Sequence, residues 1–369
     1  MNEEINSKET DGEMPVFVPS GGKSKWQKKH AKQKLVLILV FGTIGIILLF
    51  IYSLTVGIYP ISFTEAINDT WNIIIHFGPS KESTTETIIF RLRMSRSIAV
   101  LCVGAGLATA GAAMQALIRN PLVDPYITGV SSGASFMVVF VTLVGLTGGM
   151  AAISVPIAAI IGGVAAFGVT MLIAEVAGGK AMNYVLSGVI ISTGLTAAIT
   201  LLIYFNSDNY QQIMKWLFGS FTDIPWSNTI VIVFGTIIPI FITLCYAKKL
   251  NIMLLGEEHA KYLGVDTDGL KKILMVLIAV LAAFCVAYCG VIGFIGLIIP
   301  HVCRMMIGGD HRLLIPTSAL IGGMVLLIAD IFCKTAAAPG ELPIGAVVAV
   351  IGVPFFLFLM MKEGKKYAM

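Results

Sequence analysis

Ten apolar stretches, each close to the length of a membrane-crossing helix, recur along this chain and limit what it can fold into. A helix needs about 20 mostly apolar residues to cross the roughly 30 Å core of a bilayer. Only 12% of the residues are charged, whereas a soluble domain has about 25%. A soluble enzyme and a disordered chain are therefore excluded, and we predict an all-α polytopic membrane protein. The expected spans are 35–57, 94–117, 126–147, 150–174, 184–205, 228–247, 272–290, 294–307, 313–333 and 344–361.

Lys and Arg are distributed unevenly between the connections, which predicts an orientation. If both termini lie in the cytoplasm, the cytoplasmic segments hold 19 of the 25 Lys and Arg residues and the outer segments hold six. We therefore expect a multi-pass protein of the cell (inner or cytoplasmic) membrane. The expected parts are a disordered basic tail at 1–34, a membrane domain at 35–361 with a cytoplasmic loop at 248–272, and a cytoplasmic tail at 362–369.

Four of the six outer basic residues lie together at the expected outer mouth, against this bias: Arg91, Arg93, Arg96 and Lys334. Arg93 and Arg96 are three residues apart, so they share a helix face. A basic rim could dock an acidic protein or attract an anionic substrate. Alternatively, these long side chains reach lipid headgroups.

The loop at 248–272 is unusually apolar for a segment exposed to water. Its pattern predicts two short helical pieces, at 255–263 and 266–271, separated by Gly264. A pair of short amphipathic helices can dock a partner protein. Alternatively, such a helix lies flat on the membrane interface.

The eighth expected span is short and begins in a glycine-rich stretch, with Gly290, Gly293, Gly296 and Pro300. Irregular backbone at membrane depth persists only where protein or water covers it. This stretch is therefore a candidate lining and gate of a transport pathway. The alternative is an ordinary proline-kinked helix packed on its neighbours.

The sequence contains no recognisable catalytic, nucleotide-binding or metal-binding motif. Asp330 is the acid that lies well inside a span, and one acid is too few for a proton relay. Cys285 and Cys289 are one helical turn apart, but neither His nor a carboxylate joins them. We expect no catalytic residue, metal or cofactor in this chain, and the net charge of +4 suggests no nucleic-acid partner. An ATP-driven pump would need a separate ATPase.

Four blocks of sequence, in order, resemble the FecCD-type permeases. The first is RMSRSIAVLCVGAGLATAGAAMQALIRNPLVDPYITGVSSGASF at Arg93–Phe136. The others are LGEEHAKYLGV (255–265), GVIGFIGLIIPHVCRMMIGGDHRLLIP (290–316) and ELPIGAVVAVIGVPFFLFLM (341–360). That family comprises the membrane subunits of type II ATP-binding-cassette (ABC) importers for iron–siderophore, haem and cobalamin.

The resemblance implies a subunit of ten helices that works as a homodimer with two cytoplasmic ATPase subunits, which bind ATP and Mg²⁺. It also implies an extracytoplasmic substrate-binding protein that docks on Arg93, Arg96 and Lys334; the family's proline between the two arginines is replaced by Ser95. Ferric siderophore is the favoured cargo, with cobalamin, haem and molybdate as alternatives; a secondary transporter or channel working without an ATPase is the rival class. The positions implied to couple to the ATPase are Leu255, Gly256, Glu257, Glu258, Ala260, Leu263, Gly264 and Val265.

Overall fold

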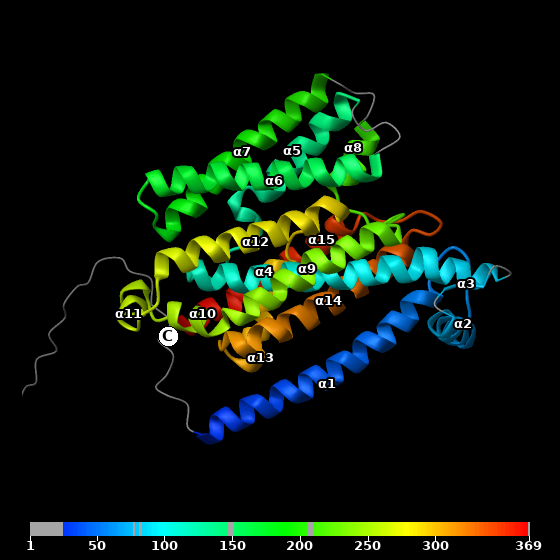
Figure 1. Ribbon diagram of the computed structural model, residues 1–369, viewed down its shortest axis with the longest axis horizontal. Helices are drawn as coiled ribbons and strands as arrows, with labels where there is room; N and C mark the ends of the chain where they lie inside the picture. The colour runs from blue at the N-terminus through cyan, green and yellow to red at the C-terminus, as the bar shows by residue number, and fades with distance from the viewer. Residues whose placement is uncertain (1–24, 77, 81–82, 146–150, 206–209, 368–369) are drawn as a thin grey trace, which may run out of the picture.

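The computed structural model describes residues 25–76, 78–80, 83–145, 151–205 and 210–367. Within these ranges the regular structure is helical throughout. The long helices run side by side along one axis, with α5, α6 and α7 on one side of the bundle and α1 on the opposite side (Figure 1). We name the two ends of the bundle by their contents: the α11 end holds α11 (Glu257–Tyr262), and the Arg96 end holds the start of α4.

Ten apolar helices occupy the positions of the ten expected spans, which confirms the predicted fold class. Seven helices of the described chain are long and apolar enough to cross a membrane. Three shorter apolar helices, α5 (Val130–Leu143), α13 (Ile295–Ile307) and the first part of α15 (Ile344–Tyr367), supply the rest. The long ones are α1 (Lys25–Thr55), α4 (Ser95–Ile118), α6 (Ala151–Val176), α7 (Ala181–Phe205), α9 (Trp226–Cys245), α12 (Thr267–Cys289) and α14 (His311–Ala336).

The first and last helices extend into the expected tails at 1–34 and 362–369. Helix α1 begins at Lys25, so residues 25–34 are helical where a disordered tail was expected. Lys, Gln and Ala favour helix, and an existing apolar helix extends into such a sequence without a new nucleation step. Residues 1–24 lie outside the described residues. Helix α15 likewise continues to Tyr367 and takes up most of the expected tail at 362–369.

Short helices fill the connections between the long ones. At the Arg96 end, Ser62 and Ser83 accept hydrogen bonds from backbone amides and so cap the first two short helices. A π-helical turn then leads directly into α4. The short elements are α2 (Phe63–Ile75), α3 (Thr84–Ile88), η1 (Ile89–Met94), η2 (Pro125–Thr128), α8 (Tyr210–Leu217), α10 (Ala247–Met253) and α11.

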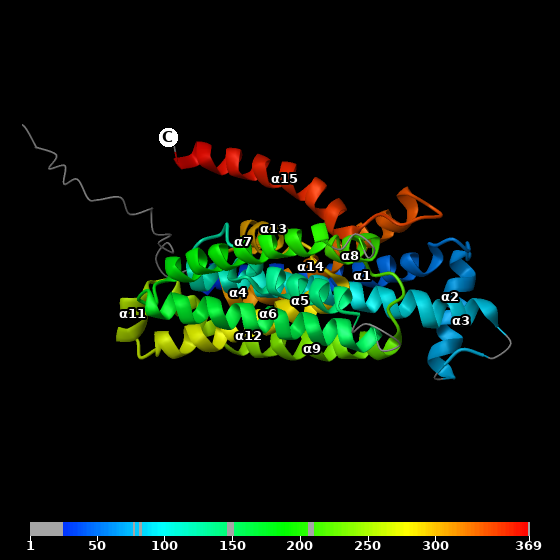
Figure 2. The same ribbon diagram turned by 90° about the horizontal axis from the view of Figure 1, so that it is seen from above.

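Helix α4 forms the centre of the bundle and is buried along most of its length. A Cβ atom on Gly104 would collide with the carbonyl oxygen of Gly322 on α14, so only glycine allows this approach. Gly133 on α5 and Gly162 on α6 meet in the same way. Small residues at helix contacts are typical of membrane bundles, and here they bring the backbones together. Helix α15, by contrast, diverges from the bundle along its length (Figure 2).

Candidate functional site

Four charged side chains form a cluster at the Arg96 end of the bundle. Arg96 on α4 donates from Nε and Nη2 to Asp330 Oδ1 on α14, at 3.0 and 2.8 Å. Lys334, one turn further along α14, places its Nζ 2.8 Å from Asp330 Oδ2. The second carboxylate of the cluster is Glu341, which receives two hydrogen bonds from Arg96 Nη1, at 2.7 and 2.9 Å. Two cations and two anions are thus paired inside the protein.

Glu341 lies in the connection between α14 and α15 and is less buried than its partners. Its side chain is 32% exposed, compared with 10% for Arg96 and 1% for Asp330. Thr222 Oγ1, from the α8–α9 connection, also donates to Glu341 Oε2 at 2.8 Å. Burial raises the pKa of Glu341, but the hydrogen bonds and charge of Arg96, with Thr222 and Lys334, outweigh burial and lower it.

The side chains of the expected rim residues Arg93, Arg96 and Lys334 are turned inward in this structure. All three are less than 10% exposed. Arg93 donates to the carbonyl oxygens of Leu54 and Tyr59, while Arg96 and Lys334 bind internal carboxylates. The acceptors of Arg93 and Arg96 are supplied by distant parts of the chain, so local sequence gave no sign of them, whereas Lys334 pairs with Asp330 one turn earlier on the same helix. A docking role for the three residues stays a prediction.

Ser95 takes a specific place in the packing where the family has proline. Its Oγ donates to the carbonyl oxygen of Ile224 at 2.5 Å and lies 2.9 Å from Thr229 Oγ1 on α9. Ser95 is fully buried, and the helix continues through it without a break. Ser95 therefore ties the start of α4 to α9 and to the connection before it.

At the opposite end, α11 forms the centre of the predicted coupling loop. Gly256 and Gly264, with φ of +104° and +78°, bound the helix at positions that favour glycine. Ala260 is fully buried and anchors α11 to the bundle, whereas Tyr262 and Leu263 are 91% and 61% exposed. The predicted helix at 255–263 is thus confirmed. The second piece, at 266–271, is instead the first turn of α12, which begins at Thr267 after the N-cap residue Asp266.

Two polar contacts fix this loop to long helices. The Nζ atom of Lys271 on α12 lies 2.8 Å from Oε2 of Glu257, which is the first residue of α11. Asn251 on α10 donates to Asp310 Oδ1 at 2.7 Å and accepts from the backbone amide of His311, at the start of α14. Burial raises the pKa of Asp310, but hydrogen bonds from Arg312 and Asn251 outweigh it and lower the pKa to about 2. Nothing in the sequence distinguished Asn251 beforehand.

The glycine-rich stretch is a true break between α12 and α13. Gly290 ends α12 with a φ of +72°, and Phe294 precedes α13 with a φ of +67°. Gly296 packs against Pro125 and the backbone of α4, whereas a Cβ on Gly293 would meet no heavy atom within 4 Å. Pro300 lies inside α13. Protein therefore covers most of the break, and Gly293 borders open space.

Backbone hydrogen bonds join this break to two other connections. The amide of Ser220 donates to the carbonyl oxygen of Cys289 at 2.9 Å. From the start of α15, the amides of Ile344 and Gly345 donate to Gly219 and Phe218, at 3.2 and 3.0 Å. The α8–α9, α12–α13 and α14–α15 connections are thus joined into one unit, which we call the three-loop junction.

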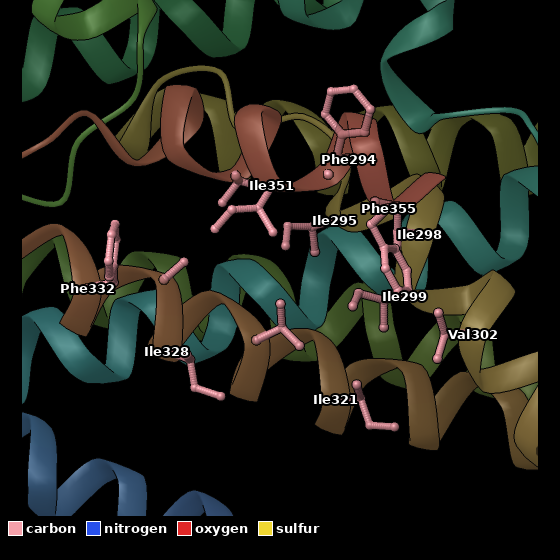
Figure 3. A pocket seen from close by; sticks show the side chains of 14 residues that line it. Phe294, Ile295, Ile298, Ile299, Val302, Ile321, Ile328, Phe332, Ile351 and Phe355 are labelled. Atoms are coloured by element: carbon pink, nitrogen blue, oxygen red, sulfur yellow. The ribbon is translucent and has the colours of Figure 1, made fainter. Parts of the chain in front are cut away.

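An apolar pocket of about 410 Å³ lies between α13, α14 and α15. Side chains from all three helices converge on it (Figure 3). Its lining offers no charged side chain to a metal or an ionic ligand, so the pocket suits only apolar groups. The lining residues are Phe294, Ile295, Ile298, Ile299, Val302, Ile321, Val325, Ile328, Ala329, Phe332, Val348, Ile351, Gly352 and Phe355.

Known proteins match this chain over most of its length. The model of the FecCD transport family matches residues 45–362. The hemin transport system permease protein HmuU of Yersinia pestis is 36% identical, covering 89% of this chain and 96% of HmuU. The cobalamin import system permease protein BtuC of Halobacterium salinarum is also 36% identical, covering 75% and 74%. The Fe(3+)-citrate import system permease protein YfmD of Bacillus subtilis is 33% identical, covering 91% and 97%.

A solved structure shares the fold. It is described as a metal-chelate type ABC transporter in an inward-facing conformation, with 31% sequence identity and a TM-score of 0.76. The match covers 88% of this chain and 99% of that chain. The chain therefore belongs to the FecCD transport family and is a permease subunit of an ABC importer, with ATP hydrolysis on separate partner subunits.

Proposed function

We propose that this permease imports a metal chelate, with a ferric siderophore as the favoured cargo and cobalamin or haem as alternatives. The observation that carries the proposal is the match of nearly the whole chain to permeases named for hemin, cobalamin and ferric citrate. All three cargoes are metals enclosed by an organic ligand. Such a cargo needs no metal-ligating side chain in the pathway, and we propose that the chain itself binds no cofactor.

The proposed assembly has a second copy of this chain, two cytoplasmic ATPase subunits that bind ATP and Mg²⁺, and an extracytoplasmic binding protein. The diverging helix α15 supports a contact with the second copy (Figure 2). Val350 and Ile351, on this helix, are 73% and 61% exposed within one subunit. A partner helix or lipid would cover such a surface. We assign this exposed face of α15 to the contact with the second copy, because the face lies beside the apolar pocket.

We place the α11 end in the cytoplasm and the Arg96 end outside. The distribution of Lys and Arg over the connections supports this orientation in the cytoplasmic membrane, with both termini inside. The exposed Tyr262 and Leu263 then form an apolar face that an ATPase subunit can cover. Coupling runs through the segment Leu255, Gly256, Glu257, Glu258, Ala260, Leu263, Gly264 and Val265.

The Arg96 end is the proposed docking surface for the binding protein. Arg93, Arg96 and Lys334 remain the proposed recognition residues, although they are paired internally here. The cargo then enters beside the three-loop junction, where Gly290, Gly293, Gly296 and Pro300 line or gate the pathway. Open space next to Gly293 supports this placement.

The rival, a transporter that works without an ATPase, finds no support among the relatives. It needs a membrane-embedded acid that can bind and release an ion. Asp330 is the acid that it would use, and both of its oxygens are held by Arg96 and Lys334.

The test is uptake by proteoliposomes that contain the permease with its ATPase and its binding protein. Labelled ferric siderophores, cobalamin and haem are offered in parallel, with ATP inside the vesicles. We expect ATP-dependent uptake of one chelate class, lost when the ATPase is omitted. Uptake that persists without the ATPase, or uptake of no chelate in the panel, would contradict the proposal.

A further inference from the structure

We propose that Glu341 masks Arg96 from the docking protein, and that a carboxylate of that protein replaces Glu341 on Arg96 when it docks. The inference rests on the proposed function, because it concerns how the Arg96 end receives its partner. It begins from the finding that Arg96 already binds two carboxylates, and that these two are held very differently.

The inner carboxylate is fixed in place. Asp330 lies within the regular helix α14 and is 1% exposed. Its two oxygens are shared between Arg96 and Lys334, which is itself buried. Removing Asp330 would leave Lys334 buried without a carboxylate and Arg96 with only Glu341, so the inner carboxylate is costly to displace.

The outer carboxylate can leave at a much lower cost. Glu341 follows the end of α14 in a non-helical connection, and a third of its side chain is exposed. It binds Arg96 through Nη1 alone, and its other partner is the hydroxyl of Thr222. Solvent can take over these bonds if the side chain turns outward.

The charge of the cluster changes when Glu341 leaves. With Glu341 in place, Arg96 and Lys334 are balanced by two carboxylates, so the four groups of the cluster exert no net attraction on an approaching acidic surface. Without it, the cluster carries one net positive charge, and Arg96 Nη1 faces outward. A carboxylate of the partner that takes this place restores both hydrogen bonds, so the exchange conserves the number of charge-assisted bonds.

If Glu341 had a purely structural role, its removal would weaken docking instead of strengthening it. If the contact only braces the docking surface, then its loss loosens the α14–α15 connection and weakens docking. The variant Glu341→Gln separates the two cases because it retains the size of the side chain and removes its charge. Glu65→Gln, on α2 at the same end of the bundle, is the matched control for a general change of charge.

The experiment uses the whole permease–ATPase complex in lipid nanodiscs and has two readouts. The first is the rate at which phenylglyoxal, an arginine reagent, modifies Arg96, followed by mass spectrometry. The second is the affinity of the complex for the binding protein of the same import system. We expect Glu341→Gln to be modified several times faster and to bind about tenfold more tightly, as expected for the loss of one competing ion pair. Glu65→Gln should match the wild type in both readouts.

Unchanged modification of Arg96, or binding by Glu341→Gln that is equal to or weaker than wild type, would overturn the inference. Equal tightening by Glu65→Gln would also overturn it, because the effect would then be one of general charge. If the binding protein fails to bind even the wild-type complex, the proposed function fails instead. The phenylglyoxal rates still decide whether Glu341 masks Arg96.

Discussion

Lys271 on α12 and Glu257 at the start of α11 form a 2.8 Å ion pair that fixes the exposed helix of the proposed coupling loop to a long helix of the bundle. The Lys271 side chain is 5% exposed, and Glu257 is its nearest carboxylate, with Asp268 Oδ1 at 3.9 Å. We predict that Glu257→Gln lowers the free energy of unfolding by about 1–2 kcal/mol, because Glu257 is partly exposed and solvent compensates in part. It should also raise the amount of ATP hydrolysed per chelate imported.

The control for this prediction is a neighbouring pair of the same type. Lys261 and Asp268 lie 3.2 Å apart, but both side chains are more than half exposed. Lys261→Gln should change the stability by less than about 0.5 kcal/mol. Thermal unfolding and the ratio of ATP to chelate are measured for both variants. Equal effects of the two would show that the Lys271–Glu257 pair has no special role.

The second prediction concerns the centre of the charged cluster. Asp330→Asn leaves Lys334 buried without a carboxylate and removes one of the two acids on Arg96. We expect a loss of about 3 kcal/mol, as for other broken buried ion pairs. The double variant Asp330→Asn with Lys334→Met should recover part of the loss, because it removes the stranded cation. Thermal unfolding in detergent measures both, and a loss of the same size in both variants would contradict the prediction.

The third prediction separates packing from transport in the break between α12 and α13. A Cβ atom on Gly290 would collide with the carbonyl oxygen of Trp216, and its φ is positive, so Gly290→Ala should lower both stability and uptake. Gly293 borders open space, so Gly293→Leu should leave the unfolding temperature unchanged and reduce uptake by obstructing the pathway. Normal uptake by a stable Gly293→Leu variant would remove Gly293 from the pathway.

The fourth prediction is a dependence of stability on pH. The pKa of Asp310 is about 2 in the fold and 3.8 ordinarily. An acid whose pKa is lowered by folding stabilises the fold above its ordinary pKa and loses this contribution as the pH falls towards 2. Asp310→Asn should therefore cost about 2 kcal/mol at most at pH 6 and almost nothing at pH 2. Thermal unfolding across this range tests it, with the exposed Asp268→Asn as control; a pH-independent difference would contradict it.

Sequence predicted the features that depend on local pattern. The ten apolar stretches fixed the number and place of the membrane helices, because crossing a bilayer demands a length and a composition that any window of sequence reveals. The helix at 257–262 fell inside the predicted piece at 255–263, because the apolar pattern of this loop and the glycine at 264 are local signals as well. The predicted ends of the first and last helices were less accurate. Helix α1 begins at Lys25 and helix α15 ends at Tyr367, so both extend into polar sequence that contains no stop signal.

Pairing between distant residues could not be predicted. Arg96 and Glu341 are 245 positions apart, and no periodicity relates them. The sequence therefore identified the cations as unusual but placed them on an exposed rim, whereas long-range contacts turn them inward. Asn251 was missed altogether, because an amide in a polar loop resembles any other until its partners Asp310 and His311 are known.

The three-loop junction has a mechanical consequence. Its connections are joined by backbone amides and carbonyls, which substitutions other than proline leave in place. The helices that these connections join, α8, α9, α12, α13, α14 and α15, are therefore linked at this end, and displacing one connection alone breaks its backbone hydrogen bonds to the others. In the proposed orientation, opening of the outer face would then be concerted, and a force that reaches one of these helices from the α11 end would be transmitted to the others.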